Sequence, residues 1–176
     1  HSGREVVFNP LRRLANGSYE MDFDHLESII DARCKILILS NPHNPAGIVW
    51  SRETLLRLAE IADRHNLVVI SDEIHCDMTL YGNHHIPFAT VSDAAARCSI
   101  TFGAPSKTFN IAGIVSSYAI IPDATLRERF YSWLSACEMD APTIFAMVAT
   151  EAAFRKGELW RRQMLAYVEQ NINFVD

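Results

Sequence analysis

Three short motifs, each at or just beyond the end of a short apolar run, constrain most strongly how this chain can fold. They are Asn41–Gly47, Ser71–His75 and Ala104–Asn110. In open α/β sheets, ligands bind beyond the carboxyl ends of the strands. The motifs therefore predict one sheet that brings an Asn, an Asp and a Lys to the same edge.

The apolar runs themselves predict the sheet. We expect strands at Ile36–Leu39, Leu67–Ile70, Ser99–Phe102 and Val115–Ile121. The first two runs are continuous, which is typical of strands buried on both sides, and a helix opening at Ser51 lies between them. This strand–helix–strand order favours parallel strands joined by a right-handed crossover. Only about a dozen residues separate the third run from the fourth, which is too few for a full crossover helix. We therefore expect the fourth strand to run antiparallel at a sheet edge.

The rest of the chain is expected to be mainly helical. A short strand at Val6–Phe8 precedes a helix capped by Asp22 or Asp24, and further helices begin near Ala124, Pro142 and Glu158. The expected fold class is therefore α/β, a mostly parallel sheet with an antiparallel edge strand, flanked by helices. The last helix reaches Asp176 without a terminating Gly, so we expect the chain to stop inside it.

Composition limits the classes of function. The 176 residues include 16 Lys+Arg and 21 Asp+Glu, a net charge of −5, which leaves no broad basic surface for nucleic acid. The four cysteines form no Cys-x-x-Cys pair, which suits a reducing cytosol and a cytoplasmic location. No apolar run approaches the ~20 residues of a membrane helix. The adjacent His84 and His85 do not predict a metal site, so we expect no metal. Together with the charge and the apolar runs, this leaves no expected membrane or nucleic-acid partner.

Lys107 is the candidate for covalent chemistry. A lysine can form an imine with a cofactor aldehyde and later act as a free base. Ser106, directly before it, carries a hydroxyl that can bind phosphate. Taken alone, Lys107 is better explained as an ordinary surface lysine at the end of a strand.

Three residues of the first two motifs complete the candidate set, each with a structural alternative. Asp72 follows a buried strand, where a protonated ring nitrogen could pair with its carboxylate, but it could also cap a helix. Asn44 stands between two prolines, and its amide could donate to a phenolate oxygen or close an Asx-type turn. His75 could reach the same oxygen or be purely structural. An Asn, an Asp and a Lys converging at one sheet edge are what a pyridoxal phosphate site requires. No Gly-x-Gly-x-x-Gly loop follows any strand, which disfavours a dinucleotide-binding domain.

These motifs give the chain a resemblance to a known family. It resembles the large domain of fold-type I pyridoxal-phosphate enzymes of the aspartate aminotransferase superfamily, and within them the PatB/MalY-like cystathionine β-lyases (C–S lyases). The similar segments are Asn41–Trp50, Ser71–His75, His85–Ala89 and Pro105–Gly113. His75 stands where aminotransferases commonly carry a Tyr.

The resemblance implies a role for each candidate residue. Lys107 would bind the cofactor covalently, Asp72 would pair with the pyridine nitrogen, and Asn44 would bond the phenolate oxygen. His75 would take the place of the Tyr that bonds the same oxygen, and Ser106 would bind phosphate. Many relatives place a phosphate-binding Arg where this chain has Val115, a difference that the lyase group tends to permit.

The resemblance also implies a function. It is the α,β-elimination of sulfur amino acids such as L-cystathionine or L-cystine, which yields pyruvate, ammonia and a thiol, by a homodimeric enzyme with pyridoxal 5′-phosphate. Two alternatives stay open: an aminotransferase with the same site, and a non-catalytic regulator of this family that binds another protein.

Complete members of the family are longer at both ends, which implies a domain division. Residues 1–157 would be part of the cofactor-binding large domain, and residues 158–176 would begin an inter-domain helix leading to a small domain absent from this chain. The aromatic that stacks on the cofactor ring and the Arg that holds the substrate carboxylate would lie outside the chain. We therefore expect this fragment alone to be inactive.

Overall fold

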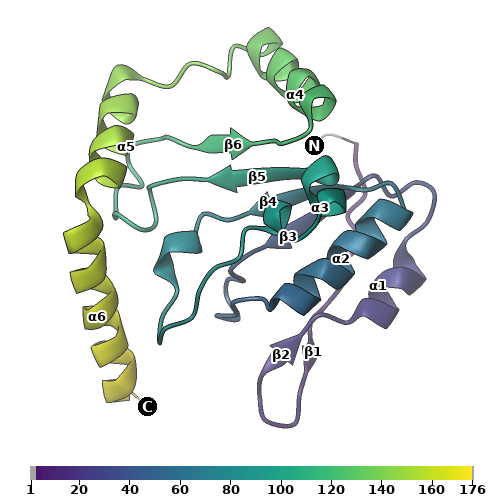
Figure 1. Ribbon diagram of the computed structural model, residues 1–176, viewed down its shortest axis with the longest axis horizontal. Coiled ribbons are helices and arrows are strands. Elements are labelled where there is room, and N and C mark those ends of the chain that lie inside the picture. Colours follow the sequence, from purple (N-terminus) through teal and green to yellow (C-terminus); the bar gives the residue numbers. More distant parts are fainter. Residues whose placement is uncertain (1–2, 176) are drawn as a thin grey trace.

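The structure, a computed structural model, describes residues 3–175 and is built around a four-stranded sheet (Figure 1). The strands lie in the order β3-β4-β5-β6, with β3, β4 and β5 parallel and β6 antiparallel to β5. Their bounds are β3 Ile36–Ser40, β4 Val68–Asp72, β5 Ser99–Gly103 and β6 Tyr118–Ile120. The predicted mostly parallel sheet with an antiparallel edge strand is confirmed.

The three parallel strands end level with one another. Ser40 of β3 lies in register with Asp72 of β4, and Asp72 lies in register with Phe102 of β5. Because the strands point the same way, the loops that follow them leave from the same edge of the sheet. All three sequence motifs lie at that edge.

Helices flank this sheet, and a separate two-stranded hairpin precedes it in the chain. Their bounds are α1 Phe23–Ile29, α2 Arg52–Arg64, α3 Asp93–Cys98, α4 Ala124–Ala136, α5 Ile144–Lys156 and α6 Glu158–Val175, with 3₁₀ helices η1 Cys76–Met78 and η2 Phe88–Thr90 and a hairpin of β1 Arg12–Arg13 with β2 Tyr19–Glu20. Asp22 caps α1 by accepting from the N–H of His25 at 2.9 Å, and Ser51 caps α2, as predicted. In Figure 1, α5 and α6 form a column at the end toward which β5 points, while α1, α2 and α3 gather toward the other end.

The core lies between the sheet and helices α2 and α3. Leu55 and Ile61 of α2 are completely buried, together with Val69 of β4 and Phe88 of η2. The buried residues of α2 recur at helical spacing, so one side of this helix is apolar and the other faces solvent. This packing fixes β3 and β4 relative to each other, because α2 is the connection between them.

Three strand predictions need correction. Val6–Phe8 is not a strand, since among residues 3–175 no strand lies beside it to complete a hydrogen-bonded ladder, and Phe8 is 78% exposed. β3 is not buried on both sides: Ile38 is 76% exposed, because α2 covers only the other face of this edge strand. The fourth strand is shorter than predicted and begins at Tyr118, with Val115 left in the preceding loop.

The remaining predicted helices are present, with α4, α5 and α6 beginning at Ala124, Ile144 and Glu158. The predicted end of the last helix at Asp176 lies outside the described residues. No helix between Gly3 and Val175 is both long and apolar enough to cross a membrane.

Candidate functional site

The structure brings Asn44, Asp72 and Lys107 to one edge of the sheet. Asp72 is the last residue of the central strand β4. Asn44 lies in the loop that leaves β3, and Lys107 lies in the loop that leaves β5. β3 and β5 are the two neighbours of β4. The sequence-predicted residues therefore reach the same edge from three adjacent strands.

The first loop is held by Asn41 and presents Asn44 to the outside. Asn41 is fully buried; its backbone N–H donates to the carbonyl of Asp72 at 3.0 Å and its side-chain amide donates to the carbonyl of Ile86 at 3.0 Å. The peptide bonds before Pro42 and Pro45 are both cis. Asn44 is exposed, and its side-chain amide has no hydrogen-bond partner among residues 3–175. The predicted Asx-type turn is not formed by Asn44, whose side chain is available to a ligand.

Asp72 is half-buried, and its carboxylate is only weakly engaged. One oxygen accepts from the N–H of Ile74 at a long 3.3 Å, and the other has no partner within the described part of the chain. No α-helix starts at Asp72; the next helical element is the short η1 at Cys76–Met78. The alternative role of Asp72 as a helix cap is therefore wrong. A half-buried carboxylate with an open oxygen is suited to pairing with a cation.

Lys107 stands on a tight turn. The N–H of Phe109 donates to the carbonyl of Pro105 at 2.9 Å, and that of Ile111 donates to the carbonyl of Ser106 at 3.0 Å. Asn110 adopts the left-handed conformation with φ 53°, which Asn tolerates better than most residues. The side chain of Lys107 is exposed and makes no ion pair with any residue from 3 to 175. The turn leaves this amine accessible at the sheet edge.

Aromatic packing anchors the Lys107 turn to the helical column. The ring of Phe109 meets that of Phe154 in α5 at 5.7 Å between centroids and that of Trp160 in α6 at 6.1 Å. A Cβ on Gly157, the residue between the two helices, would lie 2.4 Å from a ring carbon of Phe109. Gly157 therefore lets the ring seat against the junction of α5 and α6.

The side chains of His75 and Ser106 make no hydrogen bond within the described part of the chain. His75 precedes η1 and is half-buried, with no side-chain bond to that helix. Ser106 is half-buried in the Lys107 turn. Neither side chain hydrogen-bonds to a residue between 3 and 175, so both roles stay predictions. Val115, at the position where many relatives carry an Arg, is 86% exposed.

We predicted no chemistry for Glu73, but in the structure its carboxylate lies at the centre of a hydrogen-bond network. It is 4% exposed, and its carboxylate accepts from Ser71 Oγ at 2.8 Å, from the N–H of Phe88 at 2.9 Å and from His85 Nε2 at 2.7 Å. A glutamate directly after a buried strand needs partners, and that signal could have identified it.

Burial keeps two polar groups near this edge neutral. It raises the pKa of the Cys76 thiol to about 12, and the neighbouring Asp77 and Glu73 carboxylates act in the same direction. Cys76 therefore stays a thiol at neutral pH and is not a nucleophile. Burial also lowers the pKa of His43, whose ring packs edge-on against Trp50 at 5.8 Å between centroids.

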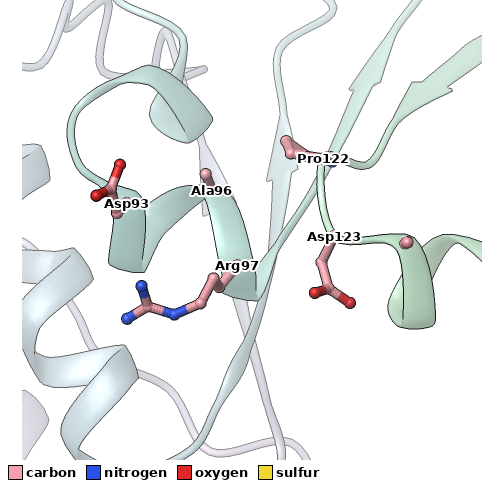
Figure 2. A pocket seen from close by; sticks show the side chains of 6 residues that line it. Asp93, Ala96, Arg97, Pro122 and Asp123 are labelled. Carbon is pink, nitrogen blue, oxygen red and sulfur yellow. The ribbon is translucent and has the colours of Figure 1, made fainter.

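A shallow cavity of about 420 Å³ lies elsewhere. It is lined by Asp93, Ala96, Arg97, Pro122, Asp123 and Ala124, whose arrangement Figure 2 shows. These residues come from α3, which leads into the start of β5, and from the segment that follows β6 and enters α4 at Ala124. The cavity therefore lies at the amino end of β5, away from the motifs. Arg97 also bonds Asp63 at 3.4 Å.

Comparisons with known proteins agree with this arrangement. Residues 1–175 match the family described as aminotransferase class I and II. Cystathionine beta-lyase PatB of Bacillus subtilis is 46% identical over 173 residues, and protein MalY of Escherichia coli is 33% identical over 174 residues. Both alignments cover 98% of this chain and 44% of the relative, so the chain spans less than half the length of these curated relatives.

A solved structure supports the same assignment. Cystalysin from Treponema denticola, which contains a pyridoxal 5′-phosphate cofactor, superposes with a TM-score of 0.93 at 34% identity. The superposition covers 98% of this chain and 44% of cystalysin. The fold class predicted from the sequence is thus that of enzymes solved with this cofactor. On the match of its whole described length, the chain belongs to the aminotransferase class I and II family.

Proposed function

We propose that the whole protein is a pyridoxal-phosphate-dependent C–S lyase of the cystathionine β-lyase type. The observation that carries the proposal is the convergence of Asn44, Asp72 and Lys107 at the carboxyl edge of three adjacent parallel strands. The 46% identity to cystathionine beta-lyase PatB favours this chemistry within the family.

The residues at the edge fit pyridoxal 5′-phosphate. The open oxygen of Asp72 suits a protonated ring nitrogen, since a cationic partner stabilises a carboxylate that is partly removed from water. The accessible amine of Lys107 suits an aldehyde, and the unbonded amide of Asn44 can donate to a phenolate oxygen. We assign His75 to the same oxygen and Ser106 to the phosphate group.

The chemistry follows from these groups. When bound, pyridoxal phosphate withdraws electrons from the α-carbon of an amino acid. Asp72 keeps the ring nitrogen protonated by pairing with it, and Asn44 orients the ring through its amide. The amine of Lys107 removes the α-proton, as a general base at the reacting carbon. In the net reaction, the bond between the β-carbon and sulfur breaks, sulfur leaves as a thiol, and water converts the remainder to pyruvate and ammonia.

We propose that the rest of the pocket lies outside this chain. Residues 1–157 would belong to the large domain and residues 158–176 to an inter-domain helix leading to a small domain. The exposure of the Asn44 and Lys107 side chains is in keeping with this, because a ligand site normally buries most of its ligand. The fragment alone would be inactive.

The proposal is tested with the whole protein and L-cystathionine. We expect pyruvate and a free thiol to form without any added 2-oxo acid, and we expect Lys107→Ala to abolish both products. A Lys107→Ala protein that still releases pyruvate at the wild-type rate would refute the role of this lysine.

An aminotransferase is the second candidate, since the family as a whole is described by that activity. Adding a 2-oxo acid separates the two. A lyase releases thiol whether or not the oxo acid is present, whereas an aminotransferase consumes the oxo acid, forms a new amino acid and leaves the sulfur in the substrate.

We further propose that the whole protein is a cytoplasmic homodimer. All four cysteines are free, in keeping with a reducing compartment. The α5 helix exposes large apolar side chains, among them Phe145 at 83%, which a second copy or the rest of the chain could cover. Sedimentation of the whole protein and cell fractionation test the two statements.

A further inference from the structure

The carboxylate of Glu73 links the end of β4 to the segment from His85 to Phe88. Its side chain is only 5% exposed. The three groups that donate to it are a hydroxyl from β4, a ring nitrogen of His85, and a backbone N–H at the start of η2. The ring of His85 is itself only 9% exposed. A buried carboxylate that accepts three hydrogen bonds holds its partners in one geometry.

The segment from His85 to Phe88 is fixed at a second point. The side-chain amide of Asn41, from the loop after β3, donates to the carbonyl of Ile86 at 3.0 Å. The segment is thus tied to the ends of two adjacent strands, by Asn41 at β3 and by Glu73 at β4. The segment from His85 to Phe88 therefore holds the ends of β3 and β4 together at the edge of the sheet that carries the site.

The backbone between Asp72 and Glu73 is held on both sides. The carbonyl of Asp72 accepts from the N–H of Asn41 at 3.0 Å, and the N–H of Glu73 donates to the carbonyl of Phe102 at 2.9 Å. Successive side chains at a strand end point to opposite faces of the sheet. With its backbone and the next side chain fixed, Asp72 has few orientations left for its carboxylate.

We propose that Glu73 is a positioning residue that sets the orientation of Asp72 toward the cofactor. The inference rests on the proposed function, because it takes Asp72 to be the partner of the ring nitrogen. Placement matters at this point, since a displacement of about 1 Å at a functional group can cost about 100-fold in rate. In metal sites, removing the partner behind a ligating group typically changes metal affinity or activity by about 10- to 100-fold, and we expect an effect at the lower end of that range here.

The test measures cofactor binding by the apo form of the whole protein. Glu73→Gln keeps the size of the side chain and one oxygen for the Ser71 and Phe88 donors, but it removes the charge and replaces the oxygen that accepts from His85 with an NH2 group. We expect its apparent dissociation constant for pyridoxal 5′-phosphate to rise about tenfold. We also expect the pH at which the visible absorption of the bound cofactor changes to move. Ser71→Ala, which removes a single donor and disturbs the fold less, should shift both readouts in the same direction by a smaller factor.

A matched control separates positioning from general destabilisation. Ile61→Val shortens a completely buried apolar side chain of α2, which takes no part in the hydrogen bonds of Glu73. It should lower the melting temperature of the apo protein while changing the dissociation constant by less than about twofold. A double-mutant cycle with Asp72→Asn adds a second criterion. If Glu73 acts through Asp72, the double variant binds no more weakly than Asp72→Asn alone.

Each result decides between the inference and its rivals. Wild-type affinity in Glu73→Gln, equal weakening in Ile61→Val, or additive effects with Asp72→Asn would overturn the positioning role while leaving the proposed function in place. A wild-type protein that does not bind pyridoxal phosphate at all would instead refute the proposed function, and the inference with it.

Discussion

Helices α2 and α5 each have 13 residues, yet their surroundings differ sharply. α2 buries Leu55, Leu58, Ala59, Ile61 and Ala62, whereas α5 buries only Ala146. The neighbours of Ala146 are apolar but open: Ile144 is 76% exposed and Phe145 83%. The described residues bury the apolar side of α2, whereas α5 carries an apolar surface that they leave exposed.

The two helices also differ in how their apolar residues are distributed. α2 has one apolar stripe, the pattern of a helix that covers one side of a sheet. α5 is apolar on several sides, the pattern of a helix inside a larger core. The packed region, formed by the sheet and α2, meets the open region, formed by α5 and α6, at the loop of Lys107. This loop leaves the sheet and contacts α5 and α6 through Phe109.

The largest expected effect concerns the packed region. Leu55→Ala in α2 removes a completely buried side chain, so it should lower the free energy of unfolding by about 2–5 kcal/mol. Leu159→Ala in α6 is the matched control, because Leu159 is 69% exposed and its loss should cost less than about 0.5 kcal/mol. Urea denaturation of the 176-residue chain measures both, and equal losses would contradict the comparison.

A smaller effect is expected at the boundary between the two regions. A Cβ on Gly103 of β5 would lie 2.3 Å from the ring of Tyr118 in β6, which packs in turn against Phe154 of α5 at 6.1 Å. Gly103→Ala should therefore cost about 1–3 kcal/mol, since overpacking displaces the ring.

The same boundary allows a test by relief. Adding Tyr118→Ala to Gly103→Ala removes the clash, so the double variant should be no less stable than Tyr118→Ala alone when both are measured by urea denaturation. A full additional cost in the double variant would mean that Gly103 is needed for another reason.

The packed region is also the one that the sequence predicted best. Ser51, the spacing from Leu55 onward and the two apolar runs around them determine β3, α2 and β4, because their contacts are close along the chain. The exposure of Ile38 could not be predicted, since an apolar run does not reveal whether a second layer covers it. For Val6–Phe8, β propensity alone could not supply a pairing partner.

The candidate site divides in the same way. The shared edge of Asn44, Asp72 and Lys107 could be predicted because parallel strands bring their carboxyl ends together. The bonds of Glu73 could not be, because His85 and Phe88 lie 12 and 15 residues further along an irregular path that no periodicity encodes. The roles of His75 and Ser106 stay predictions, since both depend on groups that the described residues do not supply.

Helix caps provide a comparison at about 1 kcal/mol. Ser51 accepts from the N–H of Thr54 at 3.2 Å, and Thr143 accepts from that of Ala146 at 3.2 Å, so the two caps are alike in geometry. Ser51→Ala should lower the free energy of global unfolding by about 1 kcal/mol, because α2 unfolds with the core. Thr143→Ala should act mainly on α5 itself, as faster hydrogen exchange in its first turn with little change in global stability. Equal effects on global unfolding would show that α5 unfolds together with the sheet.

The smallest effect is electrostatic and lies where α6 begins. Hydrogen bonds from Arg161 and then from Arg162 lower the pKa of the Glu158 carboxyl from 4.5 to about 2. A carboxylate with a lowered pKa stabilises the folded state above its unfolded pKa, and this contribution is lost as the pH falls from about 4.5 to about 2. Because the Glu158 side chain is exposed, water and salt screen its ion pairs and the loss should be slight. A carboxyl titration followed by NMR should place its midpoint well below 4.5, and Arg161→Gln should move that midpoint back toward 4.5. An unchanged midpoint in Arg161→Gln would mean that Arg161 does not lower the pKa of Glu158, and that the start of α6 is not held by this charge cluster.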